Sequence, residues 1–366
     1  MSFAQVEAAF GSYSSSDPAY SAQLVVYIAG QRVIDLAVGA LEPDSLLPVY
    51  SSSKGATAVV IALLVERGQL EIEERVARYW PEFAQRGKSS VTVGQMLSHQ
   101  AGLPGVDGGF GWEDLLDHDA LATRLAAQRP FWRPGAGAMY HGLTLGTLAD
   151  ELVRRVDGRP VKDVLREDIA APRDLDVWLG TPESEDSRVV PALPPTQDEL
   201  AAAPAPVPDP LATLWAPRGA FIEVFSHIND PVFRRVGQPA AGMLASAQGL
   251  AGLYACLRHE ANGLPRLLSE DTIGQMSQIQ VAGNELGSNL PIRFSVIFQA
   301  PTPPRWPFGG VGAFGHDGAG GSLAFCDPIP DIAFGYTVQR MPLPGGMDAR
   351  ALELARLVRH CLRGTR

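Results

Sequence analysis

The sequence Ser51-Ser52-Ser53-Lys54 stands at the start of an apolar stretch with helical spacing. Positions i and i+3 share one face of a helix, so we expect the Ser51 hydroxyl and the Lys54 amine to lie one turn apart. A serine hydroxyl attacks an acyl carbon only when a neighbouring base takes its proton. Lysine can be that base when burial and a helix N-terminus lower its pKa, and the same dipole stabilises the oxyanion. The spacing indicates nucleophilic acyl chemistry.

Lysine is scarce in this chain, which makes Lys54 informative. Of thirty basic residues, only Lys54, Lys88 and Lys162 are lysines. The structural alternative is a serine cluster that only caps the helix, and we expect Ser52 and Ser53 to cap or to pack. The tetrapeptide therefore needs support from other parts of the sequence.

Two distant segments supply that support. Met139-Tyr140-His141-Gly142 follows Ser51 by about ninety residues, and Gly315-His316-Asp317-Gly318 lies near the end of the sequence. The order S-x-x-K, tyrosine and His-x-Gly resembles the serine β-lactamase and penicillin-binding protein superfamily, especially class C enzymes and family VIII carboxylesterases. Residues 97–104 and 134–146 are also similar to that family, and the resemblance covers roughly residues 20–362.

The resemblance implies a role for each matching position. Ser51 would be the acylated nucleophile, and Lys54 and Tyr140 would share general-base duty. His316 would occupy the place where many relatives have lysine and would assist the tyrosine electrostatically. The backbone N–H groups of Ser51 and Ala319 would form the oxyanion hole. A phenol beside a lysine ammonium is favoured as phenolate, which can accept the serine proton.

The sequence also departs from the family pattern. Gly142 stands where lactamases usually carry asparagine, and His316 replaces a permanent cation by one that depends on pH. Both changes favour uncharged esters over lactams, and we take Gly142, Asp317 and Gly318 as candidate substrate-binding residues. The structural alternatives are a buried, hydrogen-bonded Tyr140 and a loop histidine at position 316.

The predicted elements suggest how these segments meet. Strands at both ends of the chain, with helices between them, predict an α/β fold. The resemblance specifies a β-lactamase-like sandwich, in which an antiparallel sheet is flanked by helices and carries an inserted, mostly helical subdomain. We assign residues 1–80 and 240–366 to the sandwich and residues 81–239 to the subdomain, with a proline-rich loop at 191–217. Periodicity and turn residues predict strands at 23–28, 32–38, 321–326 and 332–338 and helices from Ser51, at 93–98, 112–128, 144–157 and after Asp348.

Composition excludes several other classes of protein. The net charge of -10 and the pI near 5.2 disfavour nucleic acid and anionic membranes as partners. Cys256, Cys326 and Cys361 are expected to be reduced core thiols, since they are too widely spaced for a CxxC motif. No export signal is recognisable, so we expect a cytoplasmic protein. No metal or organic cofactor is implied.

Other motif matches are weak. Residues 310–315 match G-x-G-x-x-G, but a proline-rich loop precedes them and no predicted helix follows. The remaining histidines show no ligand spacing, and we expect structural or exposed roles for them: His99, His118, His141, His227 and His360.

The sequence thus predicts a serine carboxylesterase that acts on short or medium acyl esters through a Ser51 acyl-enzyme. A β-lactamase, D-aminopeptidase or acyltransferase would use the same chemistry. A non-catalytic binding protein that keeps the fold is the alternative from another class. The sequence does not specify an oligomeric state.

Overall fold

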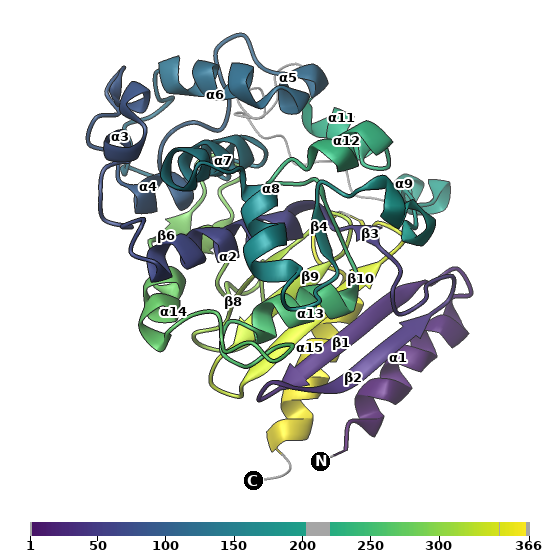
Figure 1. Ribbon diagram of the computed structural model, residues 1–366. Helices are drawn as coiled ribbons and strands as arrows, with labels where there is room; N and C mark the ends of the chain where they lie inside the picture. Colours follow the sequence, from purple (N-terminus) through teal and green to yellow (C-terminus); the bar gives the residue numbers. More distant parts are fainter. Residues whose placement is uncertain (1, 203–219, 344, 364–366) are drawn as a thin grey trace.

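A five-stranded antiparallel sheet joins the two ends of the chain. The computed structural model describes residues 2–202, 220–343 and 345–363. The strand order is β2-β1-β10-β9-β8, so the N-terminal hairpin pairs with the C-terminal strands (Figure 1). These strands are β1 (Ala22–Ile28), β2 (Gln31–Val38), β8 (Phe314–Asp317), β9 (Leu323–Asp327) and β10 (Ile332–Val338). The predicted antiparallel sheet is confirmed.

Helices cover both faces of this sheet because its buried residues alternate. Leu24 and Val26 of β1 pack in the core shared with α1 (Ala4–Ser16) and α15 (Ala349–Arg363), whereas Val25 packs against α13 (Ala247–Ala255). A Cβ at Gly335 would lie 2.4 Å from the Ala247 carbonyl oxygen, so this glycine allows α13 to approach the sheet closely. The predicted α/β sandwich is confirmed.

Helix α2 (Ser53–Glu66) directly follows the turn that contains the candidate nucleophile Ser51, and all helix residues up to Leu64 are buried. The 3-10 turn η1 (Tyr50–Ser52) precedes it. Smaller sheets lie nearby: β3 (Leu47–Pro48), β5 (Met243–Ala245) and β4 (Val177–Leu179) form one, and β6 (Val281–Asn284) and β7 (Pro291–Phe294) form the other.

The middle of the chain is mostly helical, as predicted, and it lies above the sheet in Figure 1. Its elements are α3 (Val76–Tyr79), η2 (Pro81–Ala84), α4 (Val93–Leu97), α5 (Trp112–Leu116), α6 (His118–Ala127), α7 (Thr144–Asp157), α8 (Val161–Val164), η3 (Leu165–Ala170), η4 (Glu183–Arg188), α9 (Gln197–Ala202), α11 (Ala220–His227) and α12 (Pro231–Val236). Helix α14 (Glu270–Ser277) follows later in the sequence. The division at residues 80/81 and 239/240 stays a prediction.

The bounds of two predicted helices can be compared with the structure. The helix predicted at 144–157 has those bounds, and Gly158 ends it in the left-handed region at φ +88. The single helix predicted at 112–128 is wrong. Asp117 has extended backbone there and its carboxylate caps α6 by accepting the Ala120 N–H, so two helices form. Residues 203–217 of the predicted proline-rich loop lie outside the described residues.

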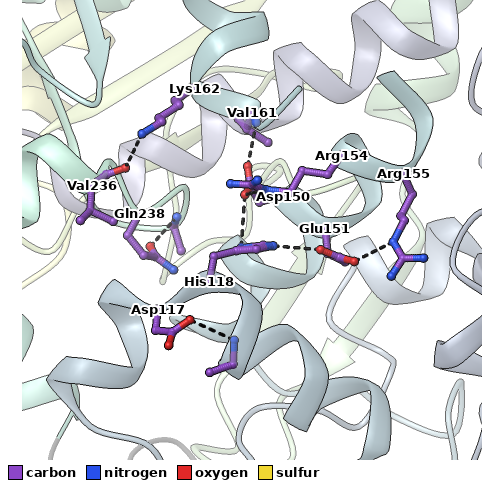
Figure 2. Close-up of polar contacts among 12 residues, drawn as sticks. Asp117, His118, Asp150, Glu151, Arg154, Arg155, Val161, Lys162, Val236 and Gln238 are labelled. Carbon is purple, nitrogen blue, oxygen red and sulfur yellow. Dashed lines mark hydrogen bonds and ion pairs between the residues drawn. The ribbon is translucent and has the colours of Figure 1, made fainter. Parts of the chain in front are cut away.

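An ionic network fastens α6 to α7. Figure 2 shows His118, at the start of α6, between Asp150 and Glu151 of α7, at 3.2 and 2.9 Å. Arg154 and Arg155 pair with the same two carboxylates at 2.8 and 2.7 Å. These contacts fix the helix that follows Tyr140 in sequence.

Other sequence predictions concern cysteines and membranes. Cys256 and Cys326 are buried free thiols as predicted, whereas Cys361, also free, is partly exposed on α15. Within the described ranges, no helix has the length and apolar character needed to cross a bilayer.

Candidate active site

Ser51 lies in the turn that leads into α2. The preceding Tyr50 has φ +48, in the left-handed region that residues other than glycine rarely adopt and that is enriched at functional sites. Ser52 is buried, and the Ser53 hydroxyl donates to the Tyr50 carbonyl at 2.5 Å and accepts the Met243 N–H at 3.0 Å. Ser52 and Ser53 therefore pack, as expected, and Ser51 faces the pocket described below.

Lys54 contacts Ser51 across one helical turn. Its Nζ lies 3.1 Å from Ser51 Oγ and donates to the Ala240 carbonyl at 2.9 Å. The side chain is buried, which lowers the pKa of Lys54 to about 7 against the opposing effect of the Asp317 charge. A substantial fraction of the amine is therefore neutral at neutral pH, and its lone pair can accept the serine proton.

Tyr140 meets the same pair from the segment before α7. Lys54 Nζ lies 4.9 Å from the centre of the tyrosine ring, and the phenol is hydrogen-bonded to Ser51. Burial raises the pKa of Tyr140 well above its ordinary value, and the Ser51 hydrogen bond offsets only part of that shift. The phenol is therefore neutral at rest, which differs from the phenolate expected from the sequence. The reason is that burial disfavours the charged phenolate, and the nearby Asp317 and Glu285 carboxylates disfavour it further.

His316 lies at the end of β8, fully buried, with its ring centre 6.2 Å from that of Tyr140. Its Nδ1–H donates to the Asp317 carbonyl at 2.7 Å, so Nε2 carries a lone pair. Burial, followed by the Lys54 charge, lowers the pKa of His316 to about 3. The imidazole is consequently neutral at neutral pH. Its electrostatic assistance to Tyr140 stays a prediction, and a neutral ring can give that assistance only through its dipole.

Asp317 and Gly318 contact other parts of the protein. The Asp317 carboxylate accepts the Gln299 side-chain N–H at 2.7 Å and the Met347 backbone N–H at 3.0 Å. A Cβ on Gly318 would lie 2.2 Å from the Val49 carbonyl oxygen, so glycine lets β8 approach the segment before Ser51. A direct contact of either residue with substrate stays a prediction.

A small pocket of about 270 Å³ of empty volume opens beside Ser51. It brings Ser51, Gly142 and Ala319 together, as the sequence interpretation requires. Most of its other walls are apolar; the lining residues are Tyr50, Ser51, Gly142, Leu143, Val224, Phe225, Ala241 and Ala319. No sequence motif marks these wall residues, since apolar side chains are common everywhere in the chain.

Two further buried polar residues, Glu285 and His99, hold the backbone around Tyr140, and the sequence predicted only a structural or exposed role for His99. The backbone N–H of Tyr140 donates to Glu285 Oε1 at 2.8 Å, and His99 Nδ1 accepts the next N–H, that of His141, at 3.0 Å. His99 lies in a segment already noted as family-like, which was the one available signal. Among the described residues, no group of three or more His, Cys, Asp or Glu side chains could hold a metal ion.

Comparisons with known proteins agree with this geometry. The sequence profile of the family described as Beta-lactamase matches residues 6–358. The Esterase/beta-lactamase LipL of Mycobacterium tuberculosis is 32% identical over 361 residues, covering 93% of this chain and 82% of LipL.

Solved structures give the same assignment. EstA from Arthrobacter nitroguajacolicus Rue61a is 37% identical with a TM-score of 0.90, over 99% of this chain and 96% of EstA. A structure described as a family VIII carboxylesterase is 32% identical with a TM-score of 0.85, over 98% and 97% of the two chains. A penicillin-binding protein homolog from Caulobacter crescentus is 33% identical with the same TM-score and the same coverage. The chain therefore belongs to the beta-lactamase family of serine hydrolases.

Proposed function

We propose that this protein is a carboxylesterase that hydrolyses short or medium acyl esters through an acyl-enzyme on Ser51. The observation that carries the proposal is the 3.1 Å contact between Lys54 Nζ and Ser51 Oγ, beside an open pocket with mostly apolar walls. Apolar walls of this kind suit the acyl group of an ester. The esterase names of LipL, EstA and the family VIII relative support an ester substrate.

Acylation begins when the neutral Lys54 amine accepts the Ser51 proton while Oγ bonds to the ester carbonyl carbon. The carbonyl oxygen becomes an oxyanion that the N–H groups of Ser51 and Ala319 stabilise. The ester C–O bond then breaks, and the departing alkoxide takes the Tyr140 proton. Lys54 returns a proton to the phenol, so both residues end as they began.

Deacylation reverses these proton movements with water as the nucleophile. A water molecule gives its proton to the Lys54 and Tyr140 pair as its oxygen bonds to the acyl carbon. The tetrahedral intermediate collapses, the acyl–Oγ bond breaks, and Ser51 recovers a proton from the pair. The pKa directions favour Lys54 as the group that first accepts a proton and Tyr140 as the group that donates one.

Covalent labelling tests the nucleophile. The parent protein should add one equivalent of an aryl phosphonate, measured by intact mass, and peptide mapping should locate it on Ser51. Ser51→Ala should lose both labelling and turnover of p-nitrophenyl esters, whereas Ser52→Ala, one residue away, should still label. Labelling of another serine in the Ser51→Ala protein contradicts the proposal, and a parent that never labels supports a binding protein instead.

Amide hydrolysis is the second candidate, because LipL carries both esterase and beta-lactamase in its name. The lack of asparagine at Gly142 and a neutral His316 argue against it. A panel of p-nitrophenyl esters, a chromogenic cephalosporin and D-alanyl anilide separates the two. Comparable turnover of amide and ester favours amide hydrolysis. Acyl transfer is revealed if an added alcohol increases the release of p-nitrophenol without an equal increase in free carboxylic acid.

A further inference from the structure

Two buried histidines, His99 and His141, bracket the segment that carries Tyr140. His99 follows α4 and has φ +68, a left-handed conformation that few residues other than glycine adopt. Its ring centre lies 5.0 Å from the ring centre of Tyr140 and 4.3 Å from that of Phe294. His99 thus packs directly against the phenol that the proposed mechanism uses.

One residue binds the backbone on both sides of Tyr140. The His99 carbonyl accepts the Met139 N–H at 3.3 Å, and His99 Nδ1 accepts the His141 N–H at 3.0 Å. The second histidine tightens the same turn, because His141 Nδ1–H donates to the Met139 carbonyl at 2.6 Å. The backbone around Tyr140 therefore depends on the place of the His99 main chain and ring.

The protonation state of His99 suits this task. Burial, followed by the nearby His141 and Lys54, lowers the pKa of His99 well below its ordinary value. A neutral ring keeps the Nδ1 lone pair, and the proton then lies on Nε2. Among the residues that the structure describes, that buried Nε2 has no hydrogen-bond partner. An unsatisfied buried donor costs stability, so packing alone does not explain a histidine here.

We propose that His99 is a positioning residue, which sets the place of the Tyr140 phenol relative to Ser51 and Lys54. The inference rests on the proposed function, in which Tyr140 passes a proton to the leaving group. His99 itself touches no reacting atom in that mechanism. It acts through the Met139–His141 backbone and through its ring contact with Tyr140.

Two substitutions separate the hydrogen bond from the backbone conformation. His99→Asn keeps an acceptor where Nδ1 lies and tolerates the left-handed region, whereas His99→Gly keeps only the backbone freedom. We expect the glycine variant to lower kcat for a p-nitrophenyl ester about 10–100-fold with KM nearly unchanged. The asparagine variant should recover most of that loss. Equal losses in the two folded variants overturn the inference.

A double-mutant cycle with Tyr140→Phe tests whether His99 acts through Tyr140. In the phenylalanine background, His99→Gly should have an effect below about twofold. A full additional loss there overturns the inference and leaves the proposed function intact. If Tyr140→Phe alone is as active as the parent, the proton-passing role of Tyr140 fails, and the inference fails with it.

Thermal unfolding of each variant controls for folding. If His99→Gly does not fold, the kcat of His99→Asn tests the inference by itself. A kcat within about fivefold of the parent value supports the role of His99 as a hydrogen-bond acceptor. A folded asparagine variant with less activity than that overturns it.

Discussion

Two clusters of titratable side chains in this protein are built in opposite ways. In the first, His118 joins Asp150 and Glu151, and an arginine also pairs with each carboxylate (Figure 2). In the second, buried Lys54 bonds a hydroxyl and a carbonyl, and no ion pair of Lys54 occurs within the described part of the chain. The first cluster compensates its charges by ion pairs, whereas the second holds an amine that is uncompensated in the sense that it lacks an ion pair among the described residues.

This difference has a chemical consequence. His118 holds the pKa of Glu151 below its ordinary value, so the carboxylate stays ionised and keeps its contacts. Burial without a direct ion pair, which the Asp317 charge offsets only in part, instead lowers the pKa of Lys54 to about 7, where the amine can gain and lose a proton during turnover. Compensated charges suit stability, whereas uncompensated burial suits proton transfer at a cost in stability.

The largest expected effect follows from removing the uncompensated amine. Lys54→Met should lower kcat about 10³–10⁴-fold, because the serine proton then has no base. The free energy of unfolding at pH 7 should rise by about 1–2 kcal/mol, since no amine has to be desolvated on folding. Ester hydrolysis and urea unfolding measure the two effects. A variant that is inactive and also less stable would contradict the idea that Lys54 sacrifices stability for activity.

The opposite result is expected in the ionic network. Asp150→Ala leaves His118, Arg154 and the Val161 N–H without their shared acceptor. The free energy of unfolding should fall by about 3 kcal/mol, whereas kcat/KM should stay within about twofold, because no reacting group is touched. Glu82→Gln is the control, since Glu82 pairs with Arg155 at the exposed surface and should change stability by less than about 0.5 kcal/mol. Loss of activity in folded Asp150→Ala would show that the network also serves the site.

A change of pH should separate the clusters without any mutation. Lys54 must be neutral to act, so kcat/KM should rise with pH through about 7 and be about 100-fold lower at pH 5. The folded pKa of Glu151 is depressed, so its contribution to stability is present above the unfolded value near 4.5 and is lost only as pH falls through the folded value. The folded pKa of Lys54 is also depressed, from 10.5 to about 7, so the free energy of unfolding should fall by about 1 kcal/mol between pH 8 and 6, a range in which Glu151 contributes no change. Unchanged stability between pH 8 and 6 would contradict a folded Lys54 pKa near 7.

Features of the fold and the site that depend on neighbouring residues in the sequence were predictable. The i, i+3 spacing of Ser51 and Lys54 survives in the structure because both lie at one helix start, and the stripe at 144–157 specifies α7 because its period matches a helix. The break at Asp117 escaped prediction because a single capping carboxylate outweighed a continuous apolar pattern.

Contacts between remote segments were not predictable in the same way. His99 and Glu285 both bind the backbone around Tyr140, yet each is far from it in sequence. Only His99 lies in a family-like segment, and that segment indicates no contact with Tyr140. The direction of the Tyr140 pKa shift was not predictable either, because it follows from the burial of the phenol, which the motif does not specify.

The smallest expected effect concerns the apolar wall of the pocket. Phe225 lines the cavity and its ring centre lies 5.8 Å from that of Tyr50. Phe225→Ala should enlarge the cavity and shift the ratio of kcat/KM values for longer over shorter p-nitrophenyl esters by about fivefold towards the longer chain. Val232→Ala, at an exposed site on the next helix, should leave that ratio unchanged. An unchanged ratio in Phe225→Ala would mean that the acyl chain binds elsewhere, whereas a shift would show that this wall selects the substrate whose bond the uncompensated Lys54 helps to break.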